Sequence, residues 1–166
     1  MSRKRVIATL AVVAVVIALA AGVAAGSASN TNASGNQLAG TWIVTVQRAA
    51  PLPPFTVHQV YTKSGSFLGF GSDASGAARS PEMGSWERVS ERLYASSGSF
   101  FRFNPQTGAQ VGSVKINRTL RLSDDGQSFT VIGRVQVLDL AGNVVTSFLA
   151  PGTGERMQVE RIAEEP

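Results

Sequence analysis

The sequence predicts an all-β fold: an antiparallel up-and-down meander of about eight to nine strands that closes into a barrel. Three observations predict it. Apolar and polar residues alternate with a period of two after residue 38, and the joints between these segments carry Gly, Pro, Asn and Asp. No segment in this part of the chain has the 3.6-residue period of a helix. Closing the meander removes its open edges. A two-sheet β-sandwich gives the same local pattern and is the alternative fold.

The segments with this pattern can be placed in chain order. They are residues 41–47, 55–62, 66–71, 84–89, 93–104, 109–122, 127–139, 144–150 and 155–162. In the first, Trp42, Val44 and Val46 alternate with polar or β-branched residues, which is typical of a half-buried strand.

The breaks between the segments have identifiable causes. Prolines at 51, 53 and 54 cannot donate to a ladder and separate the first two strands. Asp125-Gly126 favours a tight hairpin turn, since Gly readily takes the positive φ that such a turn needs. Pro151 to Gly154 is expected to break the last two strands apart. Residues 72–82 carry turn residues without a period and are expected to form the longest loop.

The N-terminal part is expected to lie outside the fold. Arg3, Lys4 and Arg5 precede the uncharged apolar run 6–23, and small residues follow it. This layout predicts a signal peptide or an N-terminal membrane-anchor helix at 1–25. Its positive start stays in the cytoplasm, so the remainder is expected to be secreted or in the extracytoplasmic cell envelope.

The remaining boundaries follow from composition. Residues 26–37 are a polar, flexible linker, 38–163 form the barrel domain, and 164–166 are a tail.

Composition limits the function. The chain has 15 Lys and Arg against 11 Asp and Glu, and three of the cations lie at the N-terminus, so no basic surface for nucleic acid is expected. There is no Cys and one His, which excludes disulfides, a thiol nucleophile and a zinc site of the usual ligands. No phosphate-binding loop, dinucleotide fingerprint or nucleophile elbow is present, so no cofactor and no catalytic residue is predicted.

Gly40-x-Trp42 on the first strand resembles the opening of lipocalins and related calycin barrels. The resemblance implies a calycin-like barrel with a ligand cavity. It also implies that Arg156 or Arg161 stacks on Trp42 and bonds to free carbonyl groups at the barrel end, a structural role. The chain lacks the Cys pair and C-terminal helix common in secreted lipocalins, which favours a calycin-like relative. The chain also resembles small exported bacterial β-domains with Gly-Thr-Trp, a second Gly-x-Trp and the motif at 123–129.

One charged residue stands among inward-facing positions. Arg118 shares a strand face with Ile116 and Leu120, and a buried charge needs a partner or water. It is interpreted as an anchor for an anionic ligand group. Alternatively, it pairs with an internal acid such as Glu87 or lies at a solvated barrel mouth. The candidate ligand-binding residues are Arg118, Tyr61, Trp86, Tyr94 and Phe103. The aromatic residues among them can equally form a packed core. His58 lacks any recognisable catalytic partner.

Three functions are compatible with these residues. The leading hypothesis is an exported, non-catalytic barrel that binds a small apolar or amphipathic molecule. The second is a structural or interaction module of the cell envelope. It predicts an exposed apolar patch on the loops at 51–54 or 72–82. The third is a barrel isomerase or cyclase that resembles allene oxide cyclase. Oligomeric state is not indicated.

Overall fold

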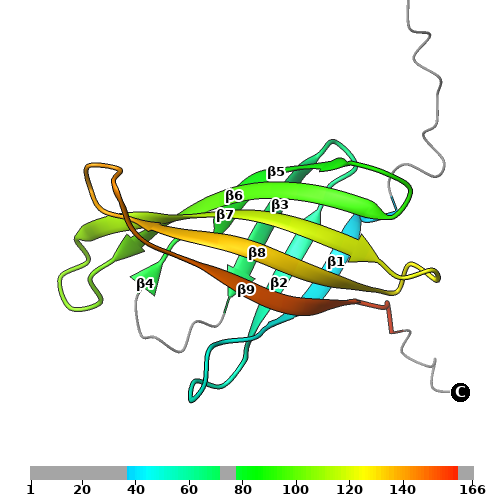
Figure 1. Cartoon of the computed structure of the whole chain (residues 1–166), viewed down its shortest axis with the longest axis horizontal. Helices are drawn as coiled ribbons and strands as arrows, with labels where there is room; N and C mark the ends of the chain where they lie inside the picture. The colour runs from blue at the N-terminus through cyan, green and yellow to red at the C-terminus, as the bar shows by residue number, and fades with distance from the viewer. Residues whose placement is uncertain (1–36, 72–77, 161–166) are drawn as a thin grey trace, which may run out of the picture. The chain divides into compact units, whose positions relative to one another are not determined.

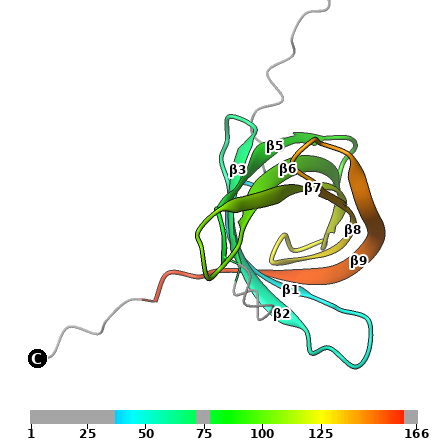
Figure 2. The same cartoon turned by 90° about the vertical axis from the view of Figure 1, so that its left-hand side faces the viewer.

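The computed structural model describes residues 37–71 and 78–160, which form a closed antiparallel β-barrel (Figure 1). The strands are β1 (Gly40–Val46), β2 (Phe55–Tyr61), β3 (Ser66–Gly71), β4 (Ala78–Arg79), β5 (Glu82–Arg88), β6 (Leu93–Phe103), β7 (Gln110–Leu122), β8 (Ser128–Leu138) and β9 (Val144–Arg156). Eight strands pair in the order β6-β5-β3-β2-β1-β9-β8-β7, and β7 pairs with β6 to close the ring seen in Figure 2. β4 pairs with the end of β6. The predicted all-β barrel is confirmed, and the β-sandwich alternative is not observed.

The expected signal or anchor segment at 1–25 and nearly all of the expected linker at 26–37 lie outside the described residues. Within the described ranges, no helix has the length and apolar character needed to cross a membrane.

The largest difference from the predicted strands is β9, which is one strand where the sequence predicts two. β1 pairs with residues 152–156 of β9, so Pro151 lies just past the last ladder pair, where its missing N–H costs nothing. The carbonyl of Pro151 still accepts a hydrogen bond from the N–H of Gln47 at 2.9 Å. A Cβ at Gly154 would overlap the ring of Phe129, so this glycine serves packing inside a strand and not a turn.

A smaller difference lies in the predicted loop at 72–82. Residues 72–77 lie outside the described residues, but Ala78 and Arg79 form β4 and Glu82 already belongs to β5. β5 therefore begins two residues before the predicted start at Gly84. This shift brings a glutamate into the inward-facing row of the strand.

The barrel interior contains two apolar clusters. The larger one comprises Leu38, Trp42, Val44, Val57, Tyr61, Phe67, Trp86, Tyr94, Leu120, Leu122, Phe129 and Val131. The second comprises Phe100, Val114 and Val135, with Ile116, Val137 and Ala150 packed against them. Since Val46 pairs with Gly152 at the end of the β1–β9 ladder, the second cluster lies on β6–β9 beyond the end of β1. We call this region the Phe148 end, after the β9 residue paired with Val135, and the opposite region the Trp42 end.

Candidate functional site

An ion pair lies between the two apolar clusters. The guanidinium of Arg118 donates two hydrogen bonds to the carboxylate of Glu82, at 2.7 and 2.8 Å. The side chains are 10% and 2% exposed, respectively. The Arg118 guanidinium also lies 5.5 Å from the ring centroid of Phe67. Burial lowers the pKa of Arg118, but the charge and hydrogen bonds of Glu82 outweigh it and hold this pKa above its usual value.

Small residues make the room for this pair. Glu82 stands opposite Gly69 in the β3–β5 ladder, and Arg118 stands between Ser96 and Gly133. A Cβ at Gly98 would lie 2.6 Å from a carboxylate oxygen of Glu82. A side chain at Gly98 would therefore displace the carboxylate.

Three predicted ligand-binding residues gather beside the ion pair. Tyr61, Trp86 and Tyr94 are buried, with ring centroids 6.0 Å apart for Tyr61 and Trp86 and 5.7 Å apart for Trp86 and Tyr94. The hydroxyl of Tyr61 donates to Oε1 of Gln59 at 2.8 Å. Burial raises the pKa of Tyr61 to about 12. These aromatic rings pack against one another in the larger apolar cluster.

Phe103 is not brought to this group. It ends β6, beyond the register shift after Arg102, and stands opposite Ala78 and Gln110. It is half-buried at the Phe148 end of the barrel.

The acidic partner of Arg118 is a residue that the sequence interpretation missed. Glu87, the suggested partner, is exposed on the outer side of β5, whereas Glu82 shares the inward side with Gly84 and Trp86. A sequence signal for this role exists, since the two-residue spacing of Glu82, Gly84 and Trp86 places all three on one face of a strand. The predicted strand begins at Gly84 and therefore leaves Glu82 out.

The Trp42 end is closed by Arg156. Its guanidinium lies 4.3 Å from the ring centroid of Trp42 and donates to the carbonyl groups of Gly126 and Ala39, each at 2.9 Å, and of Gln37. Gly40 has φ 140°, and a Cβ there would lie 2.5 Å from the guanidinium. The indole N–H of Trp42 donates to the carbonyl of Leu38. These contacts seal the barrel end with side chains. Arg161, the other candidate, lies outside the described residues.

A polar hollow of about 360 Å³ lies outside this seal, lined by Gln37, Arg88, Glu91, Arg92 and Asp124. The hollow borders the β7–β8 turn.

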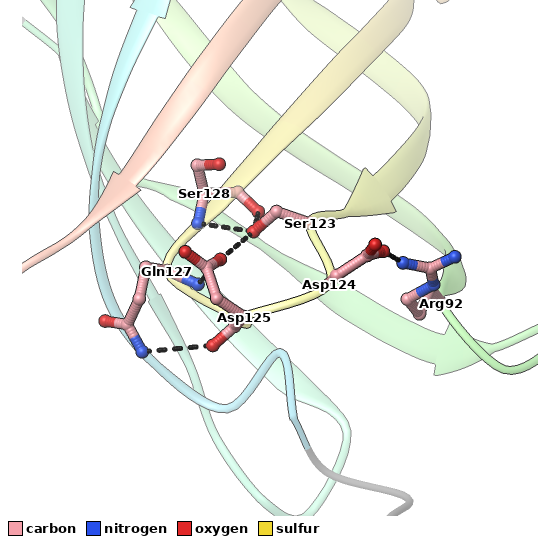
Figure 3. Close-up of polar contacts among 6 residues, drawn as sticks. All are labelled: Arg92, Ser123, Asp124, Asp125, Gln127 and Ser128. Carbon is pink, nitrogen blue, oxygen red and sulfur yellow. Dashed lines mark hydrogen bonds and ion pairs between the residues drawn. The ribbon is translucent and has the colours of Figure 1, made fainter.

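The polar side chains of that turn contact one another through hydrogen bonds and an ion pair (Figure 3). The Ser123 hydroxyl donates to Asp125 at 2.6 Å, the N–H of Gln127 donates to the same carboxylate at 2.9 Å, and Arg92 pairs with Asp124. The hydrogen bonds from Ser123 and Gln127 hold the pKa of Asp125 below its usual range. Asp124 and Asp125 therefore have structural partners, and no group of three or more metal-ligating side chains occurs among the described residues.

The Phe148 end has a different surface. Phe148 is 51% exposed, although it pairs with the buried Val135 and so faces the same inner side of the sheet. Val135 belongs to the second cluster with Phe100 and Val114. Phe148 is therefore an inward-facing apolar side chain that is half exposed, whereas Phe100, Val114 and Val135 beside it are buried, in a region where β1 provides no opposing strand.

Two further residues considered from the sequence do not line the barrel interior. His58 is exposed on the outer face of β2, between Ile43 and Phe70 in the ladder. Leu52 is exposed in the proline-rich loop where the interaction hypothesis expects an apolar patch, while part of the other loop lies outside the described residues.

Comparison with known protein families gives no matching family model, and no curated protein matches the chain. The class of protein is therefore defined by the strand arrangement alone. The described residues form a closed eight-stranded antiparallel barrel with one sealed end, a form compatible with calycin-like barrels.

Proposed function

We propose that this chain is an exported, non-catalytic barrel that binds a small apolar or amphipathic molecule at the Phe148 end. The observation that carries the proposal is the half-exposed ring of Phe148 on the inner face of the sheet, beside the buried Val135. An apolar ligand that covers this ring and the half-buried Val137 gains stabilisation from the apolar surface removed from water. The sealed Trp42 end leaves the opposite end as the entrance.

The proposal places the ligand differently from the sequence interpretation. Arg118 already directs two hydrogen bonds to Glu82, and Tyr61, Trp86 and Tyr94 fill the interior below it. The ion pair is thus the floor of the proposed site, and Phe100, Val114 and Val135 are its walls. Export is supported by the basic N-terminus and the uncharged apolar run at 6–23. If that run stays uncleaved, it also provides the membrane contact.

A matched pair of substitutions tests the site. Phe148→Asp places a charge on the inner face, whereas Ile132→Asp places one on the outer face of β8 at a residue 56% exposed. Binding is measured with the neutral apolar fluorophore N-phenyl-1-naphthylamine. The wild type and Ile132→Asp should bind it equally, and Phe148→Asp should bind at least about tenfold more weakly, because a carboxylate is costly to desolvate. Equal binding by both variants, or none by the wild type, would refute the proposed site.

A further inference from the structure

The first half of β9 is an open strand edge. β9 pairs with β8 from Val144 to Glu155, but its pairing with β1 covers residues 152–156 alone within the described chain. All residues from Val144 to Leu149 are exposed, and the alternation of buried and exposed residues begins near Gly152, where β1 joins. Residues 144–150 therefore form an edge with one strand neighbour.

The unpaired backbone groups on this edge can be assigned. The carbonyl of Pro151 accepts from Gln47, and the N–H of Met157 donates to Thr41, so odd-numbered residues of β9 direct their polar groups toward β1. The N–H of Arg156 donates instead to Gln127 on the β8 side. By this alternation, Ser147 and Leu149 direct N–H and C=O groups to the open edge, where the described residues supply no strand.

The side chains on this edge are apolar as well as exposed. Val145 is 66% exposed, Leu149 62% and Phe148 51%. Residues 144–150 (Val-Val-Thr-Ser-Phe-Leu-Ala) include no charge, Gly or Pro. Edge strands of soluble proteins usually carry charged or proline residues that prevent pairing with another chain. This edge has neither a charge nor a proline between residues 144 and 150, and its one irregularity is the register shift that leaves Val145 without a partner on β8.

We propose that the open edge of β9 pairs antiparallel with the same edge of a second copy of this chain, joining two barrels into one continuous sheet. Antiparallel pairing of a strand with itself has two-fold symmetry, so each copy uses the same surface. With Ser147 opposite Ser147, Leu149 of one copy faces Val145 of the other, and the free backbone groups of Ser147 and Leu149 gain partners.

The segment is complementary to its own copy, because apolar Leu149 meets apolar Val145 and no charged residue stands in the contact. The uncharged segment meets its copy without repulsion. The nearest cation on β8 beside Leu149 is Arg134. Arg134 and the same residue of the second copy would stand at least about 14 Å apart across three strand spacings, beyond the ~8 Å screening length at physiological ionic strength. Pairing takes place in the plane of the sheet, so it covers the edge and leaves the inner face at Phe148 accessible.

The chain has no cysteine, which gives a direct test. In a Ser147→Cys variant of the full chain, as the host processes it, any disulfide must join two molecules. Mild oxidation followed by a non-reducing gel should give a linked dimer through position 147. Thr130→Cys, exposed on β8 and paired on both sides, is the matched control and should stay monomeric. Equal crosslinking of both variants, no crosslinking at 147, or a disulfide to a different protein would overturn the proposal.

Two further variants separate edge pairing from side-chain contact. Leu149→Pro and Leu149→Ala both remove the leucine, but only proline removes the edge N–H. In sedimentation equilibrium, Leu149→Pro should weaken dimerisation at least tenfold relative to Leu149→Ala, while both retain the thermal midpoint of a folded barrel. Equal dimerisation by the two variants would show that the backbone edge is not the interface.

Discussion

Removing one partner of the buried ion pair should destabilise the barrel strongly. Arg118→Met keeps a long apolar side chain but leaves the Glu82 carboxylate, which is 2% exposed, without its cation and both of its hydrogen bonds. Breaking such a pair costs about 3–5 kcal/mol. A domain of this kind has a free energy of unfolding of about 5–15 kcal/mol, so a large share would be lost. With a urea dependence of about 1–3 kcal/mol/M, the midpoint should fall by roughly 1–5 M.

The double variant Glu82→Leu/Arg118→Met distinguishes pairing from packing. Replacing both charges by apolar side chains removes the uncompensated carboxylate, so its free energy of unfolding should return to within about 1–2 kcal/mol of the wild type. Equilibrium unfolding in urea, followed by tryptophan fluorescence, measures all three proteins. A loss below about 1 kcal/mol in Arg118→Met, or a double variant no more stable than Arg118→Met, would refute the reasoning.

Three other measurements test individual contacts. Because burial raises the pKa of Tyr61 to about 12 and also raises that of Tyr94, absorbance at 295 nm should show less phenolate at pH 10 in the folded protein than in the urea-unfolded protein. The stability that these neutral phenols contribute is complete below their ordinary pKa of about 10 and is lost as pH rises through the folded values, so equal phenolate in the folded and unfolded protein at pH 10 would contradict this burial. Asp125→Ala should destabilise the protein at pH 7. The difference in free energy of unfolding between the variant and the wild type should shrink as pH falls below about 4 and through the lowered pKa of folded Asp125. A difference that does not change with pH would show that the Asp125 carboxylate is not its cause. Gly154→Ala should cost about 1–3 kcal/mol in chemical unfolding by overlap with Phe129, and a neutral effect would show that the ring yields freely.

The meander could be predicted from local signals because they depend on neighbouring residues. Alternation places Trp42 and Val44 on the inner face, and the Asp125-Gly126 turn forms where its sequence requires it. Closure of the ring also follows, since a long meander with one apolar face has few other ways to cover its edges.

Other features could not be predicted because they depend on strands distant in sequence. Pro151 looks like a strand terminator, and it is tolerated inside β9 because β1 has ended at that point. Glu82 looks like a loop residue, and its role depends on Arg118, 36 positions further along the chain. The exposure of Phe148 likewise depends on the length of β1 and not on the sequence of β9.

The two proposals assign different functions to two sides of one segment. The inner face of β9 at Phe148 is assigned to a ligand, and the backbone edge at Ser147 and Leu149 to a second copy. Phe148→Asp should leave the disulfide at position 147 intact, and Leu149→Pro should leave fluorophore binding intact. Loss of both properties in either variant would instead indicate that the end of β9 unfolds.

The most direct test of the proposed function is native mass spectrometry of the protein, purified from its own host without denaturation. We expect a stoichiometric mass above that of the polypeptide, which disappears after organic extraction and whose value identifies the ligand. Phe148→Asp should lack this added mass, and Ile132→Asp should retain it. A wild-type spectrum with the bare polypeptide mass alone, at a concentration where added N-phenyl-1-naphthylamine also fails to bind, would contradict the proposal that the Phe148 end is a ligand site.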